Sequence, residues 1–287
     1  MQIKQAVKLS IQLNGVSESA QLDVELMLCH LLDKPGSYLF TWPEKELDPK
    51  IVDQLNVMID RRLNGEPVAH IIGMRGFWDF DLEVSPYTLI PRPDTEVLVE
   101  KALQLCSEKR ARITDLGTGT GAIALALAYE NSEWTVVASD FVPEAAQLAE
   151  RNRARLQLEN VEVIQGSWFE PHHGHYDMIV SNPPYIDPKD PHLAQGDVRF
   201  EPLSALTAED HGMADIKHIC EEARSYLVPG GHLLFEHGYD QGPVCRALLE
   251  SLGYTEIGTQ RDYGDNERVT FALWPGDTCA KGEVNAE

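Results

Sequence analysis

The chain has 287 residues, which is enough for two domains that each bury a hydrophobic core. Its formal net charge of −22 at pH 7 argues against nucleic-acid binding, because so acidic a surface gains nothing from counterion release. The five cysteines form no C-x-x-C pair and no apolar run approaches 18 residues, which argues against a disulfide framework, a zinc site and a membrane span. We therefore expect a cytoplasmic protein with reduced thiols.

Residues 1–70 are predicted to form a small helical domain. Apolar residues recur at helical spacing within the segment 20–32. A second helix is expected to begin at Asp48-Pro49, since Asp is a good N-cap and Pro fits the first helical position, and to end near Gly65. No set of catalytic side chains is evident in this domain.

The pattern changes over residues 71–90, where apolar and polar residues partly alternate. This alternation predicts a β-hairpin that links two domains. Residues 85–96 contain three prolines and lead into a helix expected from about Asp94 to Cys106. The proline-rich segment can be a plain linker or a rigid lip over a pocket.

From Arg112 onward, short apolar runs alternate with helical patterns, so we expect a parallel sheet covered by helices on both faces. This α/β domain is expected over residues 91–275 and a polar, frayed tail over 276–287. Its last two strands are close enough to form a hairpin. The expected strands lie at 113–116, 135–139, 161–165, 178–181, 232–236, 256–260 and 269–274, and the expected helices at 122–129, 143–156, 213–227 and 242–252.

A glycine-rich loop joins the first strand of this domain to its first helix. It reads Asp115-Leu116-Gly117-Thr118-Gly119-Thr120-Gly121, and its glycines allow a tight turn and close approach of the backbone to a ligand. The loop also matches the dinucleotide pattern G-x-G-x-x-G/A. That match is weak alone, because glycines occur at strand–helix turns for purely conformational reasons.

Three side chains near the loop bear on the cofactor. Asp140 ends the second strand, where a carboxylate can accept hydrogen bonds from ribose hydroxyls. Asp115 could orient the loop or receive a cationic amino-acid tail, and Trp168 could pack on an adenine or belong to the core. The combination favours S-adenosylmethionine, whose sulfonium suits an acidic protein.

The segment Asn182-Pro183-Pro184-Tyr185 follows a short buried strand. Its prolines fix φ and remove two backbone donors, so hydrogen-bond acceptors dominate: the Asn182 side-chain oxygen and the carbonyls of Asn182 and Pro183. Two acceptors on a stiff backbone suit a planar NH₂ group, which has two donors. For this motif alone, a proline turn that merely ends a strand is the alternative.

Together, Asp115–Gly121, Asp140 and Asn182–Tyr185 resemble class I, Rossmann-like methyltransferases that alkylate a planar nitrogen. Three further segments narrow the resemblance to one family: residues 89–96, 187–206 and 261–268. With them, nearly the whole chain resembles the bacterial peptide-chain release factor glutamine methyltransferases. The resemblance implies a mostly parallel sheet with an antiparallel last strand, preceded by a helical domain that recognises the substrate.

The resemblance also implies the reaction. A methyl group passes from S-adenosylmethionine to the side-chain amide nitrogen of the glutamine in the Gly-Gly-Gln motif of release factors, which supports translation termination. The implied enzyme is a cytoplasmic monomer that uses no metal and binds neither nucleic acid directly nor a membrane.

On this hypothesis the catalytic residues are Asn182, Pro183 and Tyr185. The Asn182 side-chain oxygen and the Pro183 carbonyl would each accept one N–H of the amide, and Tyr185 would pack on the glutamine side chain. Pro184 completes the substrate-binding segment. The expected cofactor-binding residues are Asp115, Gly117, Thr118, Gly119, Thr120, Gly121, Asp140, Trp168 and Asn182.

Several alternatives remain open from the residues. A nucleic-acid methyltransferase would also use acceptors for an exocyclic NH₂, but it needs a cationic track that this chain lacks as a run of Lys or Arg. A nicotinamide-dependent oxidoreductase would leave Asn182–Tyr185 without a role. The histidines at 172, 173 and 175 fit a solvated loop better than a metal site, Arg199 and Glu201 contact the acceptor or pair together, and Glu236-His237 fits strand-end packing better than an acid–base pair.

Overall fold

The computed structural model describes residues 1–276, so the expected tail over 276–287 lies outside the described residues except for Gly276. The chain divides into two compact units. The first unit comprises Met1–Met74, Val84–Pro86 and Pro191–Phe200. The second unit comprises Arg75–Glu83, Tyr87–Asp190 and the residues from Glu201 on.

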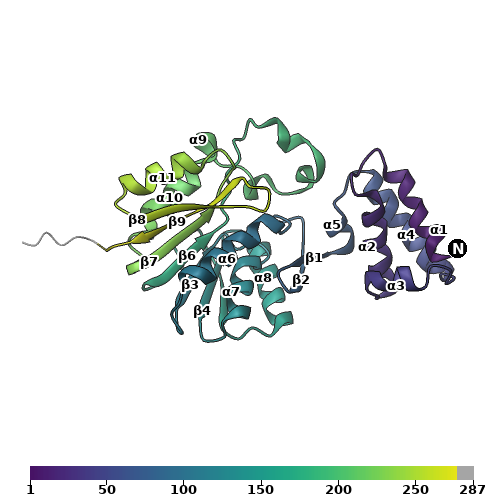
Figure 1. Cartoon of the computed structure of the whole chain (residues 1–287), viewed down its shortest axis with the longest axis horizontal. Helices are drawn as coiled ribbons and strands as arrows, with labels where there is room; N and C mark the ends of the chain where they lie inside the picture. Colours follow the sequence, from purple (N-terminus) through teal and green to yellow (C-terminus); the bar gives the residue numbers. More distant parts are fainter. Residues whose placement is uncertain (277–287) are drawn as a thin grey trace, which may run out of the picture. The chain divides into compact units, whose positions relative to one another are not determined.

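The first unit is helical (Figure 1). Both helices expected from the apolar spacing are present, as α2 (Ala20–Leu32) and α4 (Pro49–Leu63). The Asp48 carboxylate accepts a hydrogen bond from the Lys50 N–H at 2.8 Å, which confirms the predicted cap. The remaining elements are α1 (Ile3–Val7), η1 (Lys8–Leu13), α3 (Gly36–Thr41), α5 (Val68–Ile72), η3 (Pro191–Ala194) and η4 (Gly196–Phe200).

A buried arginine holds a distant segment within this first unit. The Arg62 guanidinium donates through Nε to Asp23 at 2.8 Å and through Nη1 to Asp197 at 2.9 Å. Arg62 and Asp23 are both buried, and a buried charge is costly unless it is paired. Asp197 belongs to η4, so its ion pair with Arg62 holds the segment 191–200 against α4 of the first unit.

The second unit is built on a seven-stranded sheet in the order β5-β4-β3-β6-β7-β9-β8 (Figure 1). The first five of these strands run parallel, and β9 runs antiparallel to both of its neighbours, as expected. The strands are β3 (Arg112–Leu116), β4 (Thr135–Asp140), β5 (Val161–Gln165), β6 (Tyr176–Ser181), β7 (Leu227–Glu236), β8 (Thr255–Arg261) and β9 (Glu267–Trp274).

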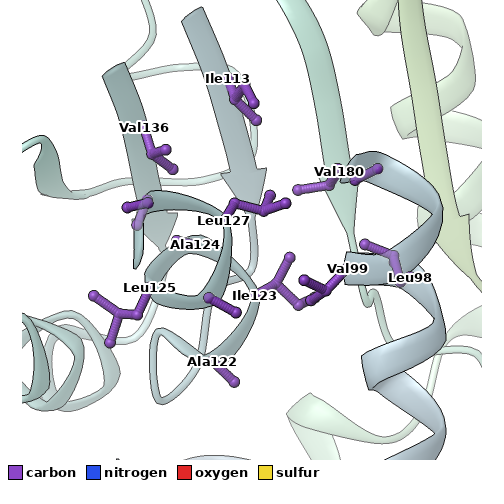
Figure 2. Close-up of a cluster of buried hydrophobic side chains, with 14 of the residues drawn as sticks. Leu98, Val99, Ile113, Ala122, Ile123, Ala124, Leu125, Leu127, Val136 and Val180 are labelled. Carbon is purple, nitrogen blue, oxygen red and sulfur yellow. The ribbon is translucent and has the colours of Figure 1, made fainter. Parts of the chain in front are cut away.

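Helices cover both faces of the sheet (Figure 1). On one face, α7 is buried nearly all round, and Figure 2 shows its Leu127 and Ile123 among side chains from β3, β6 and α6. A second apolar cluster lies on the other face, beneath α10 and α11. The helices are α6 (Glu96–Leu105), α7 (Ala122–Glu130), α8 (Pro143–Leu156), α9 (Glu209–Gly212), α10 (Ala214–Ala223) and α11 (Gly242–Ser251), with short turns η2 (Pro93–Thr95) and η5 (Leu203–Ala205).

Two boundaries differ from the prediction. The helix expected over 213–227 ends at Ala223, and β7 begins at Leu227 instead of residue 232. The strand runs through Pro229-Gly230-Gly231, residues that ordinarily interrupt a sheet. Its register against β6 shifts in this region, and such an irregularity accommodates proline and glycine.

The expected hairpin is present as β1 (Met74–Phe77) and β2 (Phe80–Glu83). The buried Asn152 side chain on α8 attaches it to the second unit. Its amide donates to the Glu83 carbonyl at 3.0 Å and to the Thr120 carbonyl at 2.9 Å, while its oxygen accepts from the Glu83 N–H at 2.8 Å. One asparagine therefore joins the hairpin to the glycine-rich loop.

Candidate active site

The glycine-rich loop between β3 and α7 adopts a conformation that requires glycine. Gly117 has a φ of +70°, and a Cβ there would lie 3.4 Å from the Trp168 ring. Gly121 has a φ of +88°, and a Cβ there would lie 2.9 Å from Leu125. Positive φ favours glycine at both positions. At Gly121 the absence of a Cβ also leaves room for the Leu125 side chain of α7.

A cavity of about 290 Å³ opens beside this loop, within the second unit. It lies where the carboxyl ends of the parallel strands meet, the usual ligand position in an open α/β sheet. Its lining includes Gly117, Thr118, Gly119, Thr120, Asp140, Phe141, Val142, Ser167, Trp168, Asn182, Pro184, Tyr87, Thr88, Leu89, Pro91 and Thr95. The proline-stiffened segment 85–96 therefore contributes to the wall of the pocket. This agrees with the interpretation of the segment as a rigid lip over a pocket.

Asp115, at the start of the loop, is fully buried and does not belong to the cavity lining among residues 1–276. Its Oδ2 accepts hydrogen bonds from the Thr118 hydroxyl at 2.6 Å and from the Ala124 N–H at 3.3 Å, so it orients the loop. Its Oδ1 accepts no hydrogen bond from any residue in the described range 1–276. Burial raises the pKa of this carboxyl to about 7, and the nearby charge of Asp140 adds to the increase.

Asp140 lines the cavity at the end of β4. One of its oxygens accepts the Gly119 N–H at 2.9 Å and the other accepts the Val142 N–H at 2.9 Å. Burial raises the pKa of Asp140, whereas the two backbone hydrogen bonds lower it. A carboxylate offers about four acceptor positions, so both oxygens can still accept hydroxyl groups of a ligand.

Two aromatic side chains, Phe141 and Trp168, also line the cavity. Trp168 is half-buried and packs against Gly117. Phe141 directly follows Asp140, and 71% of its surface is exposed. We did not single out Phe141 from the sequence; its position next to a strand-end aspartate was the signal that could have found it.

The predicted acceptor motif divides between the cavity and the interior. Asn182 and Pro184 line the cavity, whereas Pro183 and Tyr185 do not belong to its lining among residues 1–276. The Tyr185 hydroxyl instead donates to Glu236 Oε1 at 3.1 Å.

Thr95 and Glu236 complete this part of the site, and sequence analysis gave neither of them a role in it. Asn182 Nδ2 donates to Thr95 Oγ1 at 3.3 Å, and Thr95 Oγ1 donates to Glu236 Oε2 at 2.7 Å. Glu236 does not act as an acid–base pair with His237, whose ring contacts the Gly238 carbonyl and the Thr270 hydroxyl.

The structure bears on two other expectations and corrects the first. His172 is buried and does not belong to a solvated loop, because its ring lies between the Tyr176 hydroxyl at 2.8 Å and the Ser139 hydroxyl at 3.0 Å. Burial lowers the pKa of His172 to about 4. Glu201, for which a pairing with Arg199 or a contact with the acceptor was considered, forms an ion pair with Arg92 at 2.6 Å.

Two further features are absent from the described range 1–276. No group of three His, Cys, Asp or Glu side chains is arranged to hold a metal ion in this range. None of its helices has the length and apolar character needed to cross a bilayer.

Comparison with known proteins shows that two segments of the chain match known protein families. Residues 7–73 match the PrmC N-terminal domain, and residues 107–259, more than half of the chain, match a methyltransferase domain. The release factor glutamine methyltransferase of Shewanella oneidensis is 53% identical over 93% of each chain. That of Pseudomonas aeruginosa is 55% identical over 90% of this chain and 94% of the relative.

A solved structure supports the fold alone. The methyltransferase from Pyrococcus furiosus superposes with a TM-score of 0.54, covers 77% of this chain and 100% of its own, and is 19% identical. The mostly parallel sheet expected from the alternating strands and helices is confirmed, and so is the Rossmann-like methyltransferase architecture implied by the resemblance. On the strength of the identity to curated relatives over nearly its whole length, the chain belongs to the release factor glutamine methyltransferase family.

Proposed function

We propose that this protein transfers the methyl group of S-adenosylmethionine to the side-chain amide nitrogen of the glutamine in the Gly-Gly-Gln motif of peptide-chain release factors. The names of the relatives support the substrate. The observation that carries the chemistry is a single cavity lined at once by the glycine-rich loop and by Asn182. The methyl donor and the acceptor amide can therefore meet within one cavity.

The residues around the loop fit the methyl donor. Asp115 Oδ1 is a buried oxygen with no hydrogen-bond donor among residues 1–276, and the ammonium of an amino-acid tail in the cavity would supply one through a bridging water. Asp140 would accept the ribose hydroxyls, and Phe141 and Trp168 would pack on the adenine. S-adenosylmethionine supplies a methyl group that is activated by its bond to a sulfonium.

The acceptor side orients the amide of the substrate. An amide nitrogen is a poor nucleophile because its lone pair is delocalised into the carbonyl group. The Asn182 side-chain oxygen and the Pro183 carbonyl would each accept one N–H and hold the nitrogen toward the donor. As positive charge develops on that nitrogen, both acceptors bind it more tightly, which lowers the barrier. The alkylated amide is acidic enough to lose its proton to water.

The remaining roles follow from the same proposal. The helical region 1–70 would contact the release factor, and the enzyme would act as a monomer in the cytoplasm. The acidic charge of −22 favours a protein acceptor over a nucleic-acid strand.

The direct test uses a purified release factor, labelled methyl donor and mass spectrometry of the peptides. We expect one added methyl group on the glutamine of Gly-Gly-Gln, and none when that glutamine is replaced by alanine. Labelling that persists in the alanine variant, or labelling of RNA or DNA in preference to the release factor, would show that the acceptor has been misidentified.

A further inference from the structure

A chain of hydrogen bonds lies behind the acceptor motif, entirely within the second unit. Thr95 comes from η2, Asn182 follows β6, and Glu236 ends β7. Thr95 and Glu236 are 4% and 2% exposed, so neither bonds freely with bulk water. Asn182 Nδ2 lies 3.3 Å from Thr95 Oγ1, which lies 2.7 Å from Glu236 Oε2.

The chemistry of these groups fixes the direction of the chain. An ionised carboxylate only accepts hydrogen bonds, and a threonine hydroxyl has a single hydrogen to donate. Because Thr95 donates that hydrogen to Glu236, its oxygen can only accept from Asn182. The side-chain NH₂ of Asn182 must therefore face Thr95, and its oxygen must face the other way.

Opposing influences act on the pKa of Glu236, and their net effect raises it. Burial raises the pKa of this carboxyl, and the charge of Asp94 adds to the increase. Hydrogen bonds from Thr95 and Tyr185 and the positive charge of Arg268 oppose that increase. Each Glu236 oxygen accepts one side-chain hydroxyl, Thr95 on Oε2 and Tyr185 on Oε1.

We propose that Thr95 and Glu236 are positioning residues that set the orientation of the Asn182 amide, so that its oxygen and not its NH₂ faces the acceptor nitrogen. This inference rests on the proposed function, because the incoming glutamine amide presents N–H donors. An Asn182 in the flipped orientation would oppose one NH₂ to another and would lose a hydrogen bond at the reacting nitrogen. The two residues thus act through Asn182 without touching the transferred methyl group.

The test is the variant Thr95→Val, which preserves side-chain shape and removes the hydroxyl. We expect single-turnover methyl transfer to the release factor to slow by at least tenfold at saturating substrates, while the Kd of the methyl donor changes less than twofold. Thr95→Ser restores the hydroxyl and is expected to recover most of the rate. A purely structural role would not respond to the return of one oxygen atom.

Two further variants separate orientation from stability. Glu236→Met keeps a similar side-chain volume but removes the acceptor of the Thr95 hydroxyl hydrogen. The direction of the hydrogen-bond chain is then lost, and the rate of methyl transfer should again fall. Thr270→Val is the matched control, because Thr270 is equally buried and bonded to His237 and Thr259 but lies outside the cavity lining. It should lower the melting temperature without slowing methyl transfer.

Each outcome decides the inference. Wild-type rates in Thr95→Val or Glu236→Met, or equal slowing in Thr95→Val and Thr270→Val, would overturn the orienting role and leave the proposed function intact. A wild-type protein that does not methylate the release factor would overturn the proposed function, and this inference with it.

Discussion

Two buried carboxylates lie on the strands that flank β6, and they differ in how their oxygens are hydrogen-bonded. Asp115 on β3 leaves one oxygen without a hydrogen bond among the described residues 1–276, and burial raises its pKa to about 7. Glu236 on β7 accepts a hydroxyl on each of its oxygens. Among the described residues, Asp115 therefore keeps one unused acceptor oxygen, whereas both oxygens of Glu236 are satisfied by side-chain hydroxyls. In the proposed function, Asp115 belongs to the methyl-donor side of the site and Glu236 to the acceptor side.

This difference separates binding from orientation. An unsatisfied buried carboxylate is costly in the free protein and becomes favourable when a cation arrives, so it stabilises the ligand complex. A carboxylate with both oxygens satisfied contributes little new on binding, but it holds neighbouring side chains in one arrangement. Substitutions on the two sides should accordingly affect different quantities, affinity on one side and rate on the other.

The largest effect is expected at Asn182. Asn182→Ala removes one of the two proposed acceptors of the amide N–H groups, so methyl transfer should slow about a hundredfold, or roughly 2.7 kcal/mol in the barrier. Single-turnover measurement at saturating donor isolates this step. An unchanged rate would remove Asn182 from the mechanism.

The next effect belongs to the donor side. Asp115→Asn removes the charge that should receive the cationic tail of the donor, and the affinity should weaken by about 2 kcal/mol, or roughly thirtyfold. Titration calorimetry measures this directly. The rate at saturating donor should fall far less than in Asn182→Ala, and equal losses in both variants would contradict the division between the two sides.

The free protein should show a smaller effect that depends on pH. The pKa of Asp115 rises from 3.8 to about 7 on folding, so the folded state binds this proton more tightly and loses stability as pH rises toward 7. Asp115→Asn should therefore gain about 1 kcal/mol relative to wild type between pH 6 and pH 7. Chemical denaturation of both proteins at the two pH values provides the comparison. A difference that does not vary with pH would place the pKa of Asp115 in its ordinary range.

The smallest effect concerns the exposed aromatic wall. Phe141→Ala should weaken donor binding by about 0.7 kcal/mol, or roughly threefold, because one face of the adenine loses its packing. Tyr239→Ala is a suitable control, since Tyr239 is similarly exposed and lies outside the cavity lining. Equal affinities for the two variants would exclude a packing role for Phe141.

Sequence patterns predicted the local features of the fold. The α4 cap at Asp48, the glycine-rich loop and the antiparallel end of the sheet all depend on residues that are close in the chain or on the fixed geometry of α/β units. The sequence patterns failed where contacts between segments far apart in the sequence determine the structure. The start of β7 involves an irregular pairing with β6, and the buried His172 ring bonds to Ser139 on β4, 33 residues away in the sequence.

The candidate site shows the same limit. Asn182 was found because its two prolines leave a recognisable local signature. Thr95 and Glu236 were missed because their contacts join distant parts of the sequence. Thr95 is 87 residues from Asn182, and Glu236 is 141 residues from Thr95. No periodicity or spacing in the sequence encodes such a contact.

The most direct measurement is a crystal structure of the protein with S-adenosylhomocysteine and a peptide that contains Gly-Gly-Gln. The account predicts that the glutamine side-chain nitrogen lies within hydrogen-bond distance, about 2.7–3.2 Å, of both the Asn182 side-chain oxygen and the Pro183 carbonyl. A glutamine nitrogen bound elsewhere, or an Asn182 that turns its NH₂ toward the peptide, would contradict it.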